Sequence, residues 1–237
     1  MAVYVYSITA AGHPRDLDGL TGVGPTAPEL RTVSAGPLCA VVSDAPQELR
    51  PKRRDLMAHQ AVQERLMAHG TVLPLRFGLT APDDDAVRTA LEQRHDEYTQ
   101  RLADLEGCAE YHLKAAIDED VLLRQILQES PEARQLNDDI KAGDTNPDLP
   151  LALGELVAQD VLARHHALAA GIVEALRPYA RQERISEPTG GDFLNISFLV
   201  DEDHQQLFLT AEKGLTSELG SEFDFRLHGP LPAYSFV

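Results

Sequence analysis

The stretch TVLPLRFG, residues 71–78, decides how the first half of the chain folds. Its apolar residues predict a strand over 72–77, but Pro74 interrupts them, and proline lacks the N–H that a central strand uses. Around it the sequence predicts strands at 3–8 and 37–43 and helices at 53–69 and 83–106, the second opened by Asp83, Asp84 and Asp85. We therefore expect an N-terminal α+β domain over residues 1–106.

The second half alternates strands and helices in a more regular order. Strands are expected at 110–117, 181–187, 194–200 and 223–227, and helices at 153–179 and 203–219. A two-piece helical insertion at about 118–150 separates the first strand from the first long helix. The order is that of a split βαβ unit, so residues 107–237 are predicted to be a ferredoxin-like domain with a helical insertion. The fold class is thus α+β with two domains.

The segment GPLPAYSFV, residues 229–237, forms an apolar, extended tail. Tyr234 and Phe236 would be poorly solvated if they stayed in water. We expect them to dock onto their own chain and close the second domain, and the alternative is that they await a partner.

Composition excludes several classes of function. The net charge is −17, with 11 basic and 15 acidic residues in 1–106 and 10 basic and 23 acidic residues in 107–237. A nucleic acid would be repelled by this surface. No apolar run approaches the roughly 20 residues of a membrane span, and no leader is recognisable. We expect a cytoplasmic protein that contacts neither nucleic acid nor membrane.

The motifs of common enzymes are missing. There is no Walker loop, HExxH or GxSxG sequence, and the nine histidines are not spaced as metal ligands. The acidic triplets at 118–120 and 201–203 precede helices, where carboxylates act as caps. We therefore predict no catalytic, metal or cofactor site, and a binding or assembly protein rather than an enzyme.

Three arginines are the candidate partner-binding residues. Arg53 and Arg54 lie in a short basic run at the start of the 53–69 helix. This run is either a solvated entrance to the helix or a docking patch for an acidic partner. Arg76 lies in the TVLPLRFG stretch on the side opposite Leu75 and Phe77. An ion pair within the chain is the favoured fate of Arg76, and contact with a partner is the alternative.

Four segments carry a family resemblance: MAVYVYSI at 1–8, SAGPLCAVVSD at 34–44, TVLPLRFG and GPLPAYSFV. Together they resemble the gas vesicle protein F/L family, whose tail usually has tryptophan where Leu231 stands and often proline where Ala233 stands. The resemblance implies an accessory or minor structural gas vesicle protein that assists assembly and needs no cofactor. The partners it implies are the major shell protein and other gas vesicle proteins. It leaves open the oligomeric state and whether the protein stays in the vesicle. The rival interpretation is a small-molecule-binding regulatory domain or enzyme on a ferredoxin-like scaffold.

Overall fold

The computed structural model describes all residues from 1 to 237 and has a mixed α+β fold with two antiparallel sheets. The chain divides into two compact units. Unit 1 comprises Met1–Tyr111, Leu199–Glu202 and Gly229–Val237, and unit 2 comprises His112–Phe198 and Asp203–His228. Unit 1 is therefore assembled from three separate parts of the sequence, the last of which is the tail. None of the helices combines the length and the apolarity that a membrane crossing requires.

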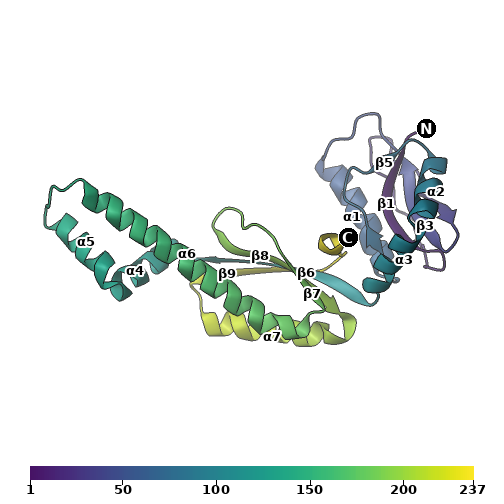
Figure 1. Cartoon of the computed structure of the whole chain (residues 1–237). Helices are drawn as coiled ribbons and strands as arrows, with labels where there is room; N and C mark the ends of the chain where they lie inside the picture. Colours follow the sequence, from purple (N-terminus) through teal and green to yellow (C-terminus); the bar gives the residue numbers. More distant parts are fainter. The chain divides into compact units, whose positions relative to one another are not determined.

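Unit 1 is built on a five-stranded antiparallel sheet in the order β2-β3-β1-β4, with β5 also paired to β1 (Figure 1). Its strands are β1 (Val3–Ala10), β2 (Arg31–Ala35), β3 (Leu38–Asp44), β4 (Leu73–Pro74) and β5 (Thr80–Ala81). Its helices are α1 (Arg53–Met67), α2 (Asp84–Gln93) and α3 (His95–Asp104).

The two faces of this sheet carry separate apolar cores. Val62 and Leu66 of α1 pack on one face, and Val87 and Leu91 of α2 with Leu102 of α3 pack on the other. Figure 1 shows α1 on one side of the strands and α2 and α3 on the opposite side. Helices on each face bury both sides of β1 and β3, which explains why these strands are mostly apolar and buried along nearly their whole length.

A bulge in β1 decides which of its side chains faces which core. The pairing with β3 shifts between Val5 and Ser7. Tyr4 and the bulged residue Tyr6 lie in the α1 core, whereas Ile8, two residues after Tyr6, lies in the α2/α3 core. An extra residue in one strand reverses the inward and outward positions that follow it, so simple alternation fails at this point.

Several predictions for this half are wrong in their details. The strand expected at 72–77 is only Leu73–Pro74, and β2 and β5 were not expected. The helix expected at 83–106 is divided into α2 and α3 at Arg94, whose φ of −110° and ψ of 26° are not helical. The expected cap is present, because the Asp83 side chain accepts a hydrogen bond from the Ala86 N–H.

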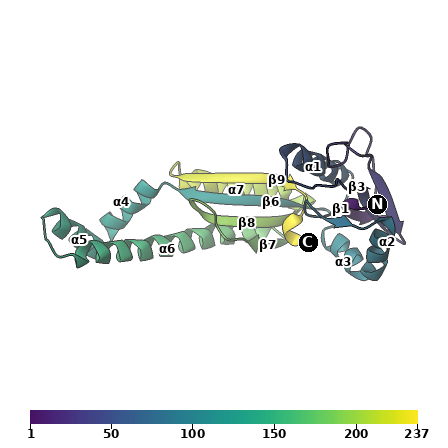
Figure 2. The same cartoon turned by 90° about the horizontal axis from the view of Figure 1, so that it is seen from above.

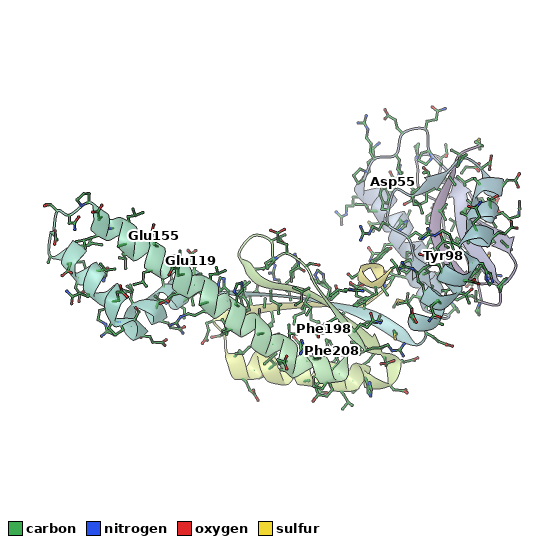
Figure 3. All side chains as sticks on the ribbon, in the orientation of Figure 1. Asp55, Tyr98, Glu119, Glu155, Phe198 and Phe208 are labelled. Carbon is green, nitrogen blue, oxygen red and sulfur yellow. The ribbon has the colours of Figure 1, made fainter.

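The second sheet, most of which lies in unit 2, has the strand order β7-β8-β6-β9 (Figure 2). Its strands are β6 (Cys108–Ile117), β7 (Gln182–Ile185), β8 (Asp192–Asp201) and β9 (Phe223–Leu231). The helix α7 (Gln205–Leu219) packs on this sheet through Phe208, whose ring centroid lies 5.3 Å from that of Phe198 in β8 (Figure 3). The short polar strand β7 is at one edge of the sheet, and β9 is at the other.

The helical insertion has its own small core. It consists of α4 (Glu119–Glu129), α5 (Pro131–Lys141) and α6 (Asp148–Leu176), which is followed by the 3₁₀ turn η1 (Arg177–Tyr179). Leu122, Ile126 and Ala133 of α4 and α5 are buried against the first half of α6. The break at Ser130 is the expected one, and the Ser130 side chain caps α5. The helix expected to start at 153 starts at Asp148, so the preceding loop is shorter than predicted.

The two acidic triplets differ in their position relative to the helix that follows them. Asp118 accepts a hydrogen bond from the Val121 N–H and caps α4, as expected. Asp201 ends β8, and the 3₁₀ turn η2 (Glu202–His204) follows before α7. The residue preceding α7 is His204, which makes no side-chain cap. The helix α7 therefore starts after a 3₁₀ turn and not directly after the second triplet.

Candidate partner-binding site

The TVLPLRFG stretch and the residues after it are fixed to β1 at both ends. β4 and β5 both pair with β1, and residues 75–79 form an arch between them. The Leu75 N–H donates to the carbonyl of Tyr6, and the Val5 N–H donates to the carbonyl of Leu79, both at 3.0 Å. Pro74 has no N–H to continue the ladder on its outer side, so the strand stops where the arch begins.

His59 of α1 holds this arch from the inside. Its Nε2 lies 3.0 Å from the carbonyl oxygen of Leu75 and therefore carries the proton and donates. Nδ1 is then the acceptor for the Tyr4 hydroxyl at 2.9 Å, and the Tyr4 oxygen accepts the Gly78 N–H at 3.1 Å. Gly78 has a φ of +106°, which glycine adopts far more readily than any other residue. The arch, β1 and α1 thus share one chain of hydrogen bonds.

His59 is neutral in this network. It is only 4% exposed, and burial lowers its pKa because the imidazolium would lose its hydration. Burial also raises the pKa of Tyr4, so its hydroxyl stays protonated as a donor. Neutral groups with satisfied donors and acceptors make this a structural histidine, with no free lone pair for a metal. No group of three or more His, Cys, Asp or Glu side chains elsewhere is arranged to hold a metal ion.

The lowered pKa of His59 predicts loss of stability in mild acid. In the unfolded chain His59 takes up a proton near pH 6.5, whereas in the folded chain it stays neutral to lower pH. The unfolded state then binds more protons, so the free energy of unfolding falls as the pH drops below about 6.5 and levels off at the folded-state pKa. Urea unfolding from pH 5 to 8 measures this slope. The variant His59→Gln should show a smaller slope than the wild type, and an equal slope would contradict the prediction.

The tail lies against the same cluster. The Tyr234 ring stacks near His59, with centroids 6.4 Å apart and planes at 28°, and burial raises the pKa of Tyr234 to about 12. The N–H and hydroxyl of Ser235 donate to the buried Glu110 carboxylate at 2.8 and 2.6 Å. Phe236 is half-buried and packs with Val237 against the α2/α3 core. These contacts place the aromatic residues of the tail on unit 1, so the expectation that the tail closes the second domain is wrong.

Gly229 lets the tail approach the first half of β6. A Cβ at this position would lie 2.5 Å from Cδ1 of Tyr111, a separation that real Cβ atoms essentially never show. Tyr111 is only 2% exposed, so its ring has little room to move away. The glycine of the GPLPAYSFV segment is therefore required by close contact rather than by its own backbone angles.

An apolar groove of about 660 Å³ opens between the arch and the two helices α2 and α3. Its walls include Leu73, Leu75 and Leu79 on the arch side and Val87 and Leu91 on α2. Val237 of the tail also lines it. Residues of both TVLPLRFG and the GPLPAYSFV tail therefore line the groove.

The charged side chains that line the groove are all arginines: Arg76, Arg94 and Arg101. Arg76 is exposed and forms no ion pair, so the intramolecular pair favoured from the sequence is wrong. Arg94 and Arg101 both pair with Glu97, at 2.7 and 3.3 Å. The rim of the groove is therefore positively charged, and Arg76 is the arginine there that has no acidic partner.

Arg53 and Arg54 lie apart from the groove, at the start of α1 on the other face of the sheet (Figures 1 and 3). Arg53 is exposed and unpaired, whereas Arg54 pairs with the buried Asp55 at 3.0 Å. The structure therefore does not bring the three predicted arginines together.

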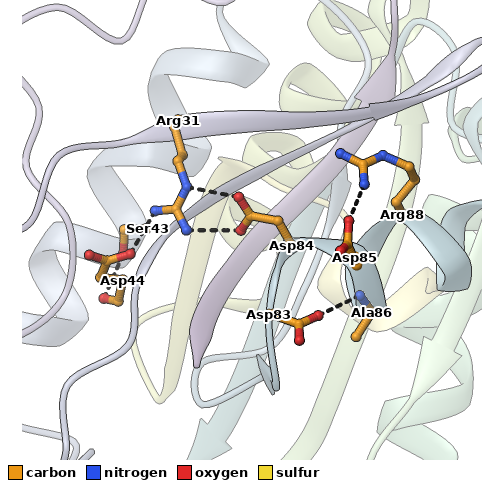
Figure 4. A network of polar contacts seen from close by, with 8 residues as sticks. All are labelled: Arg31, Ser43, Asp44, Asp83, Asp84, Asp85, Ala86 and Arg88. Carbon is orange, nitrogen blue, oxygen red and sulfur yellow. Dashed lines mark hydrogen bonds and ion pairs between the residues drawn. The ribbon is translucent and has the colours of Figure 1, made fainter. Parts of the chain in front are cut away.

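The α2 wall of the groove is tied to the sheet by Arg31 (Figure 4). The guanidinium of this β2 residue makes two bonds to Asp84 at the start of α2, at 2.8 and 3.2 Å, and one to Asp44 of β3 at 2.9 Å. These partners raise the pKa of Arg31. All three side chains are more than one third exposed, so the contribution to stability is about 1 kcal/mol or less. Its effect is to orient α2.

Comparison with known proteins gives a consistent result over the whole chain. Residues 2–237 match the model of the family described as gas vesicle synthesis protein GvpL/GvpF. The chain is 42% identical to gas vesicle protein F of Streptomyces sp. (strain CB03234), with all of both chains covered, and 29% identical to gas vesicle protein L of the same strain, over 99% of this chain and 92% of that one. Its fold is similar to the crystal structure of gas vesicle protein GvpF from Anabaena sp. PCC7120, with a TM-score of 0.86, 22% identity and coverage of 99% and 97%.

Proposed function

Because the chain belongs to the gas vesicle GvpL/GvpF family, we propose that it binds the major shell protein of the gas vesicle and assists vesicle assembly. The family match from residue 2 to residue 237 is the observation that carries this proposal. The structure supports it by the combination in unit 1 of an apolar groove and a positively charged rim, which suits a protein partner. A hydrophobic shell subunit needs such an apolar surface to stay unaggregated before it is incorporated.

We place the contact on unit 1 for an electrostatic reason. Residues 1–106 carry a net charge of −4, whereas residues 107–237 carry −13. A partner that covers the second half would have to desolvate more carboxylates, which is costly. Unit 1 offers two candidate surfaces: the α1 entrance at Arg53 and Arg54, and the groove rim at Arg76.

We also propose that the chain has two domains, the first centred on unit 1 and the second on unit 2, with the chain passing from one to the other near residues 107–112, and that the second is ferredoxin-like. The strand order β7-β8-β6-β9 supports this, because it sets β6 and β8 at the centre and β7 and β9 at the edges. The presence of α7 between β8 and β9 and of α6 between β6 and β7 agrees with a split βαβ unit carrying a helical insertion.

The test is co-purification of the chain with the major shell protein of the same organism. Charge reversal by Arg53→Glu, Arg54→Glu or Arg76→Glu should weaken capture on the order of tenfold if the substituted residue lies in the contact, because an attractive charge becomes a repulsive one. Arg184→Glu in β7, also exposed and without an ion pair, is the matched control in unit 2. Failure of the wild type to capture the shell protein would contradict the proposed function, and full binding by all three variants would remove the basis for the contact at these arginines.

The same preparations distinguish an assembly factor from a structural component. We propose that the protein acts at the gas vesicle, and its amount in purified vesicles before and after washing measures whether it stays there. Retention after washing assigns it to the vesicle, and its loss assigns it to assembly alone.

A further inference from the structure

The groove beside the arch is the strongest unassigned feature of the chain. It is apolar along its floor, and Arg76, Arg94 and Arg101 are its charged lining residues. In a chain with a net charge of −17, a groove whose charged side chains are three arginines, only two of which share a carboxylate partner in Glu97, is a local reversal of sign. A narrow apolar wall also strengthens the field of these charges, since it excludes water around them.

The backbone around the groove is already hydrogen-bonded, which decides how a partner can bind. Between β4 and β5 the polar groups of β1 are satisfied by Leu75 and Leu79. β4 and β5 have two residues each, and Pro74 provides no N–H. No row of free N–H and C=O groups is offered here to an added strand. The groove presents side chains, from the arch on one wall and from α2 and α3 on the other, and side chains of this kind accept the apolar face of a helix.

From these observations we infer that the groove binds an amphipathic helix of a partner protein, one whose apolar face is flanked by carboxylates. The leucines of the arch receive the apolar face, and Arg76 pairs with a flanking carboxylate because it has none of its own. This inference rests on the proposed function, for which it names the contact surface. It selects the groove and Arg76 over the α1 entrance with Arg53 and Arg54.

A synthetic helix tests the charge and shape argument directly. The probe is a labelled peptide of about 18 residues, roughly five turns, with leucine on one face and glutamate on the flanks. A second peptide replaces every glutamate by lysine. The full chain as a whole repels the first peptide and attracts the second, so tighter binding of the Leu/Glu peptide requires a local positive surface. We expect fluorescence anisotropy to show the Leu/Glu peptide binding about tenfold more tightly than the Leu/Lys peptide.

Variants locate the binding surface. Arg76→Glu and Leu79→Asp should each weaken the Leu/Glu peptide about tenfold, the first by charge repulsion and the second by placing a carboxylate on the apolar wall. Leu79 is 47% exposed, so a substitution there leaves the core intact, and thermal melts of both variants verify this. Leu207→Asp on α7, 54% exposed, is the matched control, and Arg53→Glu reports on the α1 entrance. Neither should change the affinity.

The inference is overturned if the Leu/Glu peptide does not bind, if the Leu/Lys peptide binds as tightly, or if Arg53→Glu or Leu207→Asp weakens binding as much as the groove variants. The same variants are then used to capture the major shell protein. Peptide binding in the groove without capture of the shell protein contradicts the proposed function and leaves the groove assignment in place. Capture that survives both groove variants but is lost in Arg53→Glu contradicts the groove and leaves the proposed function.

Discussion

Replacing His59 by alanine should lower the free energy of unfolding by about 3–5 kcal/mol. The substitution removes the donor to the Leu75 carbonyl and the acceptor of the Tyr4 hydroxyl, and it leaves buried polar groups without partners. It also opens a cavity among the rings of Tyr4, Tyr6 and Phe77, whose centroids lie 5.6–5.8 Å from that of His59. Urea denaturation of purified protein measures the loss.

The control for this experiment is His228→Ala in β9. His228 is exposed and makes no hydrogen bond, so its removal should change stability by no more than about 0.5 kcal/mol. A double-mutant cycle with Tyr4→Phe adds a sharper criterion. The two residues share a hydrogen bond, so their effects should be non-additive by about 0.5 kcal/mol or more. A loss below about 1 kcal/mol for His59→Ala, or strict additivity, would show that this network does not hold the arch.

Replacing Gly229 by alanine should release the tail and cost about 1–3 kcal/mol, the usual effect of overpacking. The added Cβ would overlap the ring of Tyr111, which is buried in the first half of β6, so the tail has to leave its place. Its departure exposes His59 and the Glu110 carboxylate. Limited proteolysis followed by mass spectrometry should show faster cleavage within residues 229–237 than in the wild type.

Two further variants make this expectation specific. Gly191→Ala adds a Cβ with nothing within 4 Å and should leave cleavage of the tail unchanged. Tyr111→Leu combined with Gly229→Ala gives the new methyl group room and should recover part of the protection. If Gly229→Ala alone leaves the tail as resistant as in the wild type, the contact with Tyr111 is not what positions it.

Local signals in the sequence were sufficient for most of the secondary structure. The helix α1, the break at Ser130 and the cap at Asp118 follow from periodicity and capping chemistry that act within a few residues. The break at Arg94 does not, because no glycine or proline marks it and the apolar period continues across it. The bulge of β1 also lacks a local signal, since it depends on the register with β3.

The site was predictable only in its parts. Pro74 and the apolar tail pointed to unusual segments, and Arg76 was identified as a candidate contact. The network joining Tyr4, His59 and Gly78 could not be derived, because it links three segments far apart in the sequence through atom positions. The sequence gives one hint of the groove. Along α2 and α3 its lining residues recur every three or four positions, at Leu91, Arg94, Tyr98 and Arg101. This spacing indicates that they share one side of the helices, but it does not reveal the opposite wall.

The division of unit 1 among three parts of the sequence has a consequence for biosynthesis. Residues 1–111 leave the ribosome early. Leu199 of their core is translated after most of unit 2, and Tyr234 and Val237 of the tail only after all of it. During translation the groove of unit 1 therefore lacks its Val237 side until residue 237 has been added. This order would benefit a protein whose partner is prone to aggregate. Only chains that have been synthesised through residue 237 present a complete groove to that partner.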